Sequence, residues 1–380
     1  MHQSAFRLFF AALFALCASA AFAQTTPAPV LAAKSWILID QSTGQTLAGN
    51  DSDARIEPAS LTKLMTAYLT FSALKAGTIS EQQMVLVSEK AWRQEGSRMF
   101  IQVGTEVSVS ELIRGVIVQS GNDASTALAE LIGGSVEGFA ALMNREAERL
   151  GMKNTHFTNP TGLPDPQLYT TARDLSKLAS AIIRDFPQYF PIYSMQSYTY
   201  NNIAQPNRNR LLFIDPTVDG MKTGHTDSAG FCLVSTARRG ERRLVSVVLG
   251  AASDNVRAQE SLKLLNYGFQ AFDTVRVYPA GQTISKFRVW KGQNDEVSVG
   301  FDHDLILSLP REKVKQIGAT LESRQPLIAP LAKGQEVGTL KLTVAGEPYG
   351  EYPVVVQDEV PLAGFFKRLW DAIKLWFKSL

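Results

Sequence analysis

The chain has 380 residues, enough for more than one domain, and its composition, with 45% hydrophobic and 19% charged residues, is that of an ordinary globular protein. Its formal net charge of +2 is too small for a protein that binds nucleic acid through a basic surface. The four histidines show no paired ligand spacing, so the sequence predicts no metal site, and nothing in it implies a cofactor.

The first 23 residues have the pattern of a secretory signal. Arg7 is followed by an apolar run over residues 8–16 and by a small-x-small cleavage site at residues 21–23. The run is shorter than the ~20 apolar residues that span a bilayer. A buried helix, a membrane anchor or a lipid on Cys17 are the alternatives, and the bulky residue before Cys17 disfavours the lipid. We therefore expect residues 1–23 to direct export and to be removed.

Residues 24–272 read as one mixed domain. Residues 35–40 form an apolar run that predicts a strand, and a helical stretch begins after Pro58. Residues 231–236 and 244–250 predict a hairpin of two core strands, joined by a polar turn over residues 237–243. Mixed elements with a late hairpin indicate an α/β or α+β layered domain.

Residues 273–358 have a different texture, because short strand-like runs alternate with Gly, Pro and Asp. This predicts a small all-β domain with a role in spacing or partner contact. The runs cover residues 287–289, 296–299, 305–309, 339–344 and 352–356.

Residues 361–380 predict an amphipathic helix. One face carries bulky apolar side chains such as Phe366 and Trp376, and the other is mostly cationic, with Lys367 and Lys374. This pattern indicates a helix that lies on the surface of a membrane rather than one that docks on its own domain. With the signal, it predicts a periplasmic protein held peripherally on the outer face of the cytoplasmic membrane.

Three short motifs stand in order along the first domain. They are Ser60-Leu61-Thr62-Lys63, Ser120-Gly121-Asn122 and Lys222-Thr223-Gly224. The first type of motif also occurs as Ser72-Ala73-Leu74-Lys75, but that copy falls late in its helical stretch. Ser60 follows Pro58 at a helix start, where a serine is exposed beside unpaired backbone N–H groups. Lys63 then lies one turn away on the same face.

These residue types predict nucleophilic catalysis by a serine. A serine hydroxyl needs a base, and Lys63 can act as one only when its amine is neutral. Burial and a second cation, which Lys222 would supply, both lower the pKa of a lysine. The hypothesis therefore asks for a neutral Lys63 and a charged Lys222.

The two later motifs complete the site. Ser120 can pass a proton to the leaving amine, and Asn122 can accept from Lys63 and donate to the substrate. Lys222 and Thr223 suit a carboxylate, and Gly224 leaves room for a substrate backbone along a strand edge. Taken alone, Ser120-Gly121-Asn122 would be read as a turn, because these residue types are common in turns.

Together the three motifs resemble those of the penicillin-binding, serine-active-site family. The longer string Lys222-Thr223-Gly224-His225-Thr226 is similar to that of the low-molecular-mass D-alanyl-D-alanine carboxypeptidases. The resemblance implies a transpeptidase-like domain with an antiparallel sheet and a helical subdomain. It also implies that Ser60 attacks the D-Ala-D-Ala end of a peptidoglycan pentapeptide and is acylated by β-lactam inhibitors. The backbone N–H groups of Ser60 and His225 would form the oxyanion hole, and Thr223 and Arg257 would hold the terminal carboxylate.

Three alternatives remain at this point. A class A β-lactamase needs a loop glutamate to activate water, and no Glu-x-x-Leu-Asn segment lies between Asn122 and Lys222. An endopeptidase for D-Ala cross-links would use the same motifs. A muropeptide-binding scaffold without catalysis is disfavoured by the intact serine and both lysines.

Overall fold

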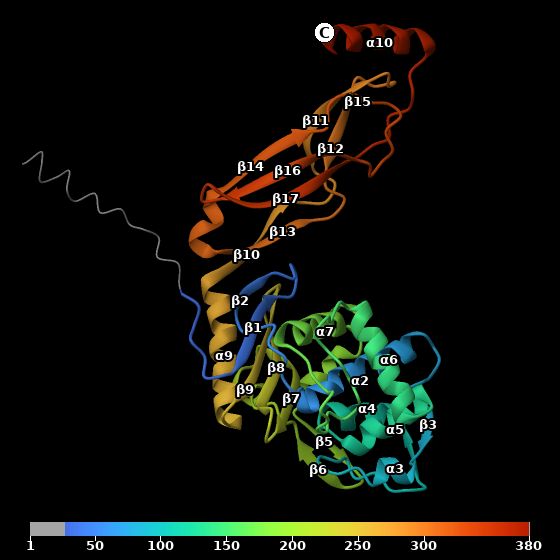
Figure 1. Cartoon of the computed structure of the whole chain (residues 1–380), viewed down its shortest axis with the longest axis vertical. Helices are drawn as coiled ribbons and strands as arrows, with labels where there is room; N and C mark the ends of the chain where they lie inside the picture. Colours follow the sequence, from blue (N-terminus) through green and yellow to red (C-terminus); the bar gives the residue numbers. More distant parts are fainter. Residues whose placement is uncertain (1–26, 380) are drawn as a thin grey trace, which may run out of the picture.

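The computed structural model describes residues 27–379, which form two domains and a terminal helix (Figure 1). The signal segment predicted at residues 1–23, with Cys17, lies outside the described residues.

A five-stranded antiparallel sheet forms the centre of the first domain. In spatial order its strands are β2 (Thr46–Asn50), β1 (Ser35–Asp40), β9 (Arg242–Ala251), β8 (Gly230–Arg239) and β7 (Val218–Thr226). The strand predicted at residues 35–40 is β1. Its side chains alternate between two cores, with Ile37 in one and Leu38 in the other, because both faces of the sheet are covered.

Helices provide that cover. On one face lies α9 (Asp254–Ala271), and on the other lies a helical group that contains the start of α2 (Lys63–Lys75) and hence the first motif (Figure 1). Each fully buried Leu or Phe of this group, such as Leu64 and Phe71, contributes roughly 1.5–3 kcal/mol of hydrophobic stabilisation. The remaining helices and short elements of the domain are η1 (Ala59–Thr62), α3 (Glu89–Trp92), α4 (Val109–Ile117), α5 (Asn122–Gly133), α6 (Val136–Arg149), α7 (Ala172–Asp185), η2 (Phe190–Ser194) and α8 (Leu211–Ile214), with the hairpins β3 (Met84–Leu86)/β4 (Glu106–Ser108) and β5 (Ser197–Tyr200)/β6 (Ile203–Pro206).

The predicted late hairpin is β8 and β9, but the predicted turn over residues 237–243 is wrong. Both strands run on through this polar segment, and only two residues separate them. The arginines stay in the strands because each finds a carboxylate: Arg239 pairs with Asp215, and Arg243 pairs with Asp219. Polar residues that looked like a turn are therefore strand residues held by ion pairs.

The second domain is built from strands, as the sequence predicted. A six-stranded sheet and a two-stranded sheet enclose one apolar core. In spatial order the larger sheet contains β14 (Ile317–Ser323), β16 (Glu336–Val344), β17 (Glu347–Val356), β12 (Glu296–Gly300), β11 (Thr283–Trp290) and β15 (Leu327–Ile328), and the smaller contains β10 (Phe272–Tyr278) and β13 (Leu305–Pro310), followed by η3 (Arg311–Gln316). The chain ends in α10 (Phe365–Ser379).

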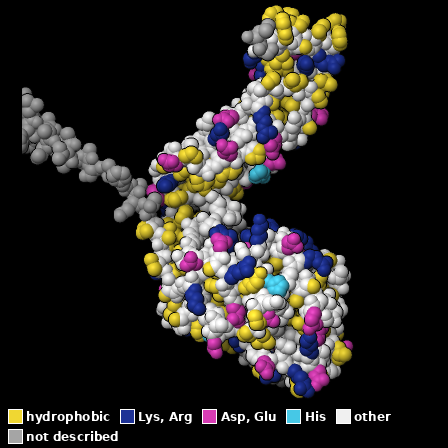
Figure 2. Space-filling view, in the orientation of Figure 1, with side chains coloured by type: hydrophobic (Ala, Val, Ile, Leu, Met, Phe, Trp, Pro, Cys, Tyr) yellow, Lys and Arg dark blue, Asp and Glu magenta, His cyan; other side chains and the backbone are white. Residues whose placement is uncertain are grey.

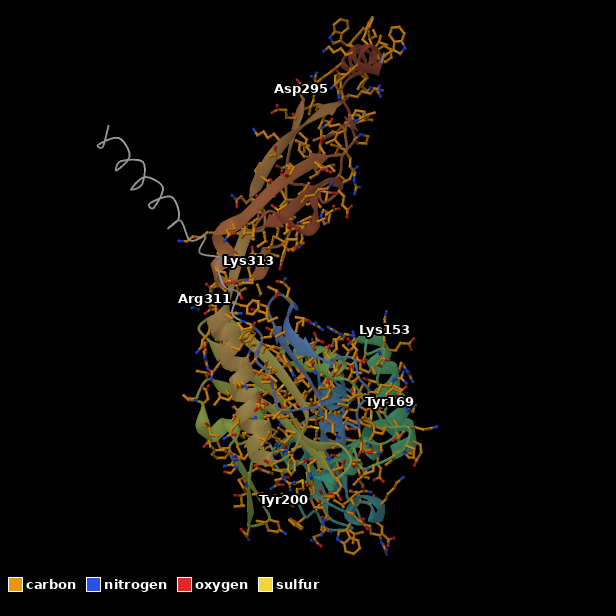
Figure 3. All side chains as sticks on the ribbon, turned by 60° about the vertical axis from the view of Figure 1, so that its left-hand side comes forward. Lys153, Tyr169, Tyr200, Asp295, Arg311 and Lys313 are labelled. Atoms are coloured by element: carbon orange, nitrogen blue, oxygen red, sulfur yellow. The ribbon has the colours of Figure 1, made fainter. Side chains whose placement is uncertain are left out.

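The two domains meet at a polar junction. Helix α9 ends at Ala271 and β10 begins at Phe272, so no linker separates them. The fully buried Asp40, at the end of β1, accepts hydrogen bonds from Arg242 Nε (3.0 Å) and Thr274 Oγ1 (2.6 Å). Figure 3 places Arg311 at the same junction, where it pairs with Asp273. The first domain and the all-β domain are thus joined by a direct chain connection and by buried polar contacts.

Two features of the described residues bear on membrane and metal binding. Within residues 27–379 no single helix is long and apolar enough to cross a bilayer, although α5 and α6, bent by 81°, pass that test as a pair. The same residues contain no group of three or more His, Cys, Asp or Glu side chains arranged to hold a metal ion.

Candidate active site

The half-buried Ser60 lies in η1, and the backbone of η1 continues directly into α2. Lys63 is therefore the first residue of α2, one turn after Ser60, and its side chain is buried. Ser72, the serine of the competing motif, lies near the other end of α2. The position at the start of the helix thus distinguishes the motif at Ser60 from the motif at Ser72, as the sequence predicted.

Three oxygen atoms surround the Lys63 amine. Its Nζ lies 2.7 Å from Asn122 Oδ1, 2.6 Å from the carbonyl oxygen of Thr161 and 3.1 Å from Ser60 Oγ. A neutral amine has two hydrogens and one lone pair, so the two carbonyl oxygens can take its hydrogens while its lone pair faces the hydroxyl. Burial, followed by the positive charge of Arg208, lowers the pKa of Lys63 to about 7.

The second motif lies between α4 and α5. Ser120 has a φ of 59°, and Asn122 begins α5. The neighbouring Asp123 accepts hydrogen bonds from the backbone N–H groups of residues 99, 100 and 101, which fixes the adjoining loop. The Asn122 amide nitrogen donates to the carbonyl oxygen of Glu95 at 2.6 Å. One of the two hydrogens of the Asn122 amide is thus bound to the loop, and Asn122 Oδ1 accepts from Lys63.

The third motif lies on β7, the edge strand of the sheet. Lys222 Nζ contacts Ser120 Oγ and the carbonyl oxygen of Thr223, both at 2.9 Å. Burial, followed by the charge of Lys63, holds the pKa of Lys222 well below its ordinary value. The surroundings therefore lower the pKa of both lysines, and they give no support to a Lys222 that alone stays charged.

Gly224 has a different role from the expected one. A Cβ at this position would lie 3.0 Å from the carbonyl oxygen of Pro58 and 3.2 Å from Leu61 Cγ. The missing side chain thus lets β7 pack directly against the segment that carries Ser60. It sets the distance between two parts of the site rather than leaving room for substrate.

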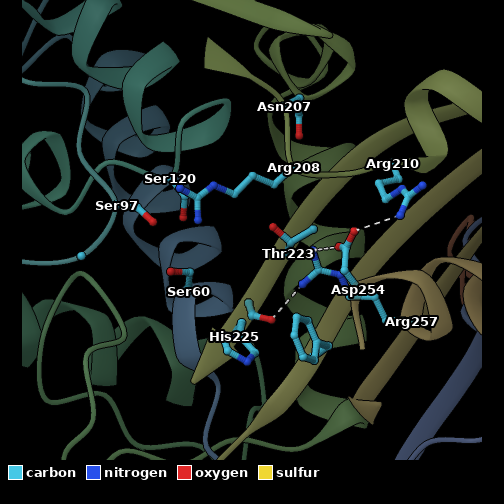
Figure 4. A pocket seen from close by; sticks show the side chains of 13 residues that line it. Ser60, Ser97, Ser120, Asn207, Arg208, Arg210, Thr223, His225, Asp254 and Arg257 are labelled. Carbon is cyan, nitrogen blue, oxygen red and sulfur yellow. Dashed lines mark hydrogen bonds and ion pairs between the residues drawn. The ribbon is translucent and has the colours of Figure 1, made fainter. Parts of the chain in front are cut away.

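A cleft of about 610 Å³ opens over these groups (Figure 4). Six residues named from the sequence line it: Ser60, Ser120, Thr223, Gly224, His225 and Arg257. Lys63, Asn122 and Lys222 lie buried behind this lining and reach it through the hydrogen bonds described above. The structure therefore brings all nine predicted residues together.

Arg257 is at the cleft, but its guanidinium is already bound. It pairs with Asp254, and its Nη1 donates to the carbonyl oxygen of Gly224 at 3.2 Å. The pair is not an ordinary surface ion pair, because Arg257 is only 6% exposed. Arg257 ties α9 to β7 at the wall of the cleft.

Sequence reasoning missed Arg208. Its side chain extends toward Ser120 in the cleft (Figure 4). No hydrogen bond or ion pair joins its guanidinium to any residue between 27 and 379. Its position depends on the fold around β6 and α8, and nothing in the run Asn207-Arg208-Asn209-Arg210 marks one arginine over the other.

The loop at residues 159–163 closes the buried side of the site. The Thr161 carbonyl oxygen binds Lys63, and Gly162 has a φ of 80°. A Cβ on Gly162 would lie 1.8 Å from the carbonyl oxygen of Ala59, so only glycine fits against the segment before Ser60. The loop thus meets the lysine with a backbone carbonyl and contains no carboxylate.

Comparison with known proteins identifies the family. Residues 22–253 match the family described as D-alanyl-D-alanine carboxypeptidase. The chain belongs to this family. Residues 272–362 match the family described as penicillin-binding protein 5, C-terminal domain.

Relatives cover nearly the whole length of this D-alanyl-D-alanine carboxypeptidase family member. The chain is 44% identical over 378 residues to D-alanyl-D-alanine carboxypeptidase DacC of Escherichia coli, covering 96% of this chain and 94% of that protein. It is 43% identical over 385 residues to DacA of Haemophilus influenzae, covering 99% and 98%. Among solved structures, penicillin-binding protein 5 from Haemophilus influenzae has a TM-score of 0.85 at 43% identity, covering 88% of this chain and 99% of that one. These matches confirm the predicted family and the predicted fold, including the terminal helix.

Proposed function

We propose that the chain is a serine-type D-alanyl-D-alanine carboxypeptidase that removes the terminal D-alanine of peptidoglycan pentapeptides. The observation that carries this function is the contact between Ser60 Oγ and Lys63 Nζ at the floor of a cation-lined cleft. Family membership and relatives named for this activity support it.

In the proposed reaction Lys63 takes the proton of Ser60 as Ser60 Oγ bonds to the carbonyl carbon between the two D-alanines. The backbone N–H groups of Ser60 and His225 stabilise the oxyanion, an interaction whose loss typically costs about 10²–10³ in rate per donor. The leaving D-alanine amine takes its proton from Ser120, which Lys222 contacts, and the proton that Lys63 took from Ser60 restores the Ser120 hydroxyl. Water then hydrolyses the acyl-enzyme and releases Ser60.

The terminal carboxylate is assigned to the cationic lining of the cleft. Thr223 and the unpaired guanidinium of Arg208 are best placed to bind it, while the Asp254-bound Arg257 holds the wall. This differs from the sequence hypothesis, which gave the carboxylate to Thr223 and Arg257.

The same site accounts for acylation by penicillins followed by slow release. A class A β-lactamase needs a loop glutamate to activate the deacylating water, whereas the loop at residues 159–163 meets Lys63 with the Thr161 carbonyl and contains no carboxylate. We therefore propose that β-lactams inhibit this enzyme. An endopeptidase activity on D-Ala cross-links is a second candidate, favoured by no feature of the cleft.

The test compares the two serines of the duplicated motif. D-Alanine release from a pentapeptide, and covalent labelling by a fluorescent penicillin, should both disappear in Ser60→Ala. Both should persist in Ser72→Ala, which keeps the same composition and lies in the same helix. Release or labelling that survives Ser60→Ala would refute Ser60 as the nucleophile.

We also propose export and membrane attachment through α10. The helix docks on the all-β domain by its polar face: Asp371 Oδ2 accepts from the Lys291 backbone N–H at 2.8 Å, and Lys367 pairs with Asp295. Its apolar side chains, including Phe366, Trp370 and Trp376, point away and are 58–85% exposed. Hydrophobic side chains gather over this helix in Figure 2. An apolar face that its own domain leaves open supports contact with a lipid surface.

A pair of variants tests the attachment. Full-length protein should bind anionic vesicles, and Phe366→Ser combined with Trp370→Ser should abolish this binding while activity on a soluble pentapeptide remains. Leu86→Ser removes an equally exposed apolar side chain, 66% exposed, from the first domain and should bind as before. Equal loss of binding in both proteins would contradict the assignment to α10.

A further inference from the structure

A hollow of about 390 Å³ opens between α7, the end of α6 and the β1–β2 hairpin. It shares no lining residue with the catalytic cleft. Gly44, in the β1–β2 turn, borders it, and the adjacent Thr43 Oγ1 lies 3.1 Å from Ser308 Oγ of the second domain. The hollow therefore lies at the end of the first domain that faces the all-β domain. Lys and Arg side chains gather at this end of the first domain in Figure 2.

Four cations line the hollow: Arg149, Arg173, Lys177 and Arg184. The last three lie on one face of α7, because their positions are spaced by one and by two helical turns. Of the acidic residues between 27 and 379, none is part of the lining. The hollow thus presents charge of a single sign.

The carboxylates that pair with these cations lie mostly behind the surface of the hollow. Glu146 is 17% exposed against 60% for its partner Arg149, and Asp174 is 4% exposed against 37% for Lys177. Arg184 is likewise the more exposed member of its pair. A buried carboxylate fixes the position of the cation, and a guanidinium with five N–H donors keeps some of them for a further acceptor. The paired cations therefore still offer a fixed binding surface to an anion.

A hydroxyl without a partner is a second sign of a ligand. Ser180 borders the hollow, and its buried Oγ has no hydrogen-bond partner within residues 27–379. Buried hydroxyls in folded proteins are seldom left without a partner. Ser180 lies one helical turn from Lys177 and one from Arg184. An oxyanion bound by these two cations is placed to accept the Ser180 hydrogen as well.

The position of the hollow favours a cell-wall polymer over a lipid as its ligand. The terminal helix α10 lies at the far end of the all-β domain (Figure 1). A lipid headgroup in a membrane that holds α10 is therefore a whole domain away. Peptidoglycan carries many peptides with free carboxylates, and a polymer of this kind can occupy two sites of one protein at once.

We propose that this hollow is a second binding site for peptidoglycan, separate from the cleft, and that it binds carboxylates of a peptide other than the one being cut. Arginine and lysine side chains on α7 and α6 hold these carboxylates, and Ser180 donates to them. The inference rests on the proposed carboxypeptidase function and predicts that the enzyme distinguishes the polymer from a soluble peptide.

Two arginines can be changed without leaving a buried carboxylate unpaired. Asp53, the partner of Arg173, is exposed, and Asp185, the partner of Arg184, keeps its hydrogen bond from Tyr68. In Arg173→Gln/Arg184→Gln, kcat/KM for D-alanine release from pentapeptide-rich peptidoglycan strands should fall by about 2- to 10-fold, the range for two exposed ion pairs. The kcat/KM for a soluble pentapeptide, which engages only the cleft, should stay unchanged.

The matched control is Arg276→Gln/Arg324→Gln. These two arginines of the second domain are also exposed, and they pair with Asp304 and Glu336. The control removes the same charge from a different surface. Both of its kcat/KM values should equal those of the wild type.

Binding can be measured apart from catalysis. Protein whose Ser60 is acylated by a penicillin has a blocked cleft, and it should still sediment with peptidoglycan through the hollow. Conversion of the peptidoglycan carboxyls to amides should abolish this binding, and Arg173→Gln/Arg184→Gln should weaken it. Because solvent ions screen exposed charges, added salt should weaken it as well.

The outcomes distinguish this inference from the proposed function. The second site would be refuted, with the carboxypeptidase left in place, if Arg173→Gln/Arg184→Gln lost no activity on strands or lost equal activity on strands and pentapeptide. Sedimentation that survives amidation would also refute it. If the variant instead lost binding to anionic vesicles and kept binding to peptidoglycan, the hollow would be a lipid site and the inference wrong. A wild-type protein that released no D-alanine from the soluble pentapeptide would overturn the proposed function itself.

Discussion

Lys63 Nζ and Ser60 Oγ lie 3.1 Å apart, and the other two neighbours of the amine are carbonyl oxygens that can accept its hydrogens. This arrangement orients the lone pair of a neutral lysine toward the hydroxyl that must lose a proton. The pKa of about 7 keeps much of the amine neutral at neutral pH. The pair therefore satisfies the geometric and the electrostatic requirement of a base.

The pH dependence of catalysis should report on Lys63. Because the base must be neutral, kcat/KM should reach half its plateau near pH 7 and fall about tenfold for each pH unit below. Lys63→Ala should lower kcat/KM by about 10²–10⁴ at pH 8. Lys75→Ala, at the exposed end of α2, serves as the matched control and should leave the profile unchanged. A profile without an acidic limb near pH 7 would contradict the assigned base.

Asn122→Asp should shift this limb. The substitution puts a carboxylate where Asn122 Oδ1 now lies 2.7 Å from Lys63 Nζ. An adjacent negative charge favours the ammonium form and raises a lysine pKa by about one to three units. The acidic limb of kcat/KM should move to higher pH by that amount. Asn122→Ala removes the acceptor without adding charge, so it should not move the limb upward to the same extent.

Arg208→Ala should act in two ways. Removing this cation raises the pKa of Lys63, since the charge of Arg208 helps to lower it. It also removes the unpaired guanidinium assigned to the terminal carboxylate, so KM should rise. The control is Arg210→Ala, because Arg210 lines the same cleft but is paired with Asp254. Identical pH profiles and KM values in wild type and Arg208→Ala would show that Arg208 neither lowers the pKa of Lys63 nor binds the substrate carboxylate.

The junction between the domains should be sensitive to Asp40. Asp40→Ala leaves Arg242, whose side chain is 12% exposed, without its carboxylate, and should destabilise the protein by about 3–5 kcal/mol in chemical denaturation. Asp273→Ala breaks an exposed pair at the same junction and should cost about 0–1 kcal/mol. Comparable losses of stability in the two variants would show that the buried Asp40–Arg242 pair contributes no more than the exposed pair.

The contribution of Asp40 should also depend on pH. Burial alone would raise its pKa, but hydrogen bonds from Ser42, Thr274 and Arg242 bring it below the ordinary 3.8. A carboxyl with a lowered pKa in the folded state stabilises fully above its unfolded pKa and loses this effect as pH falls through the folded value. The stability difference between wild type and Asp40→Ala should thus be constant near neutrality and shrink below about pH 4.

Local spacing made part of the site predictable. Ser60 and Lys63 are one helical turn apart, so their contact follows from the sequence. The contact between Ser120 and Lys222 joins residues 102 positions apart and could be expected only through resemblance to a family. Arg208 carries no local signal at all, because its place in the cleft depends on how β6 and α8 fold over β7.

The fold, like the site, was predictable where the signal is local and not where it depends on distant residues. Strongly apolar runs such as β1 were identified because both faces of the sheet are buried. The polar end of the β8–β9 hairpin was misread as a turn, since ion pairs with distant residues such as Asp215 keep Arg239 in a strand. Gly224 was assigned to substrate access, whereas its closest neighbours, Pro58 and Leu61, come from the segment around Ser60.

The direct passage from α9 into β10 makes the molecule a rod with chemistry at one end and an apolar helix at the other (Figure 1). A rod with a fixed end on a surface works at a set height and cannot fold back to reach closer material. If α10 rests on the membrane, the enzyme samples only those peptides that lie within one layer of the wall. The height of the active site above the membrane then helps to select its substrates. A longer or shorter all-β domain would change that height without any change to the catalytic residues.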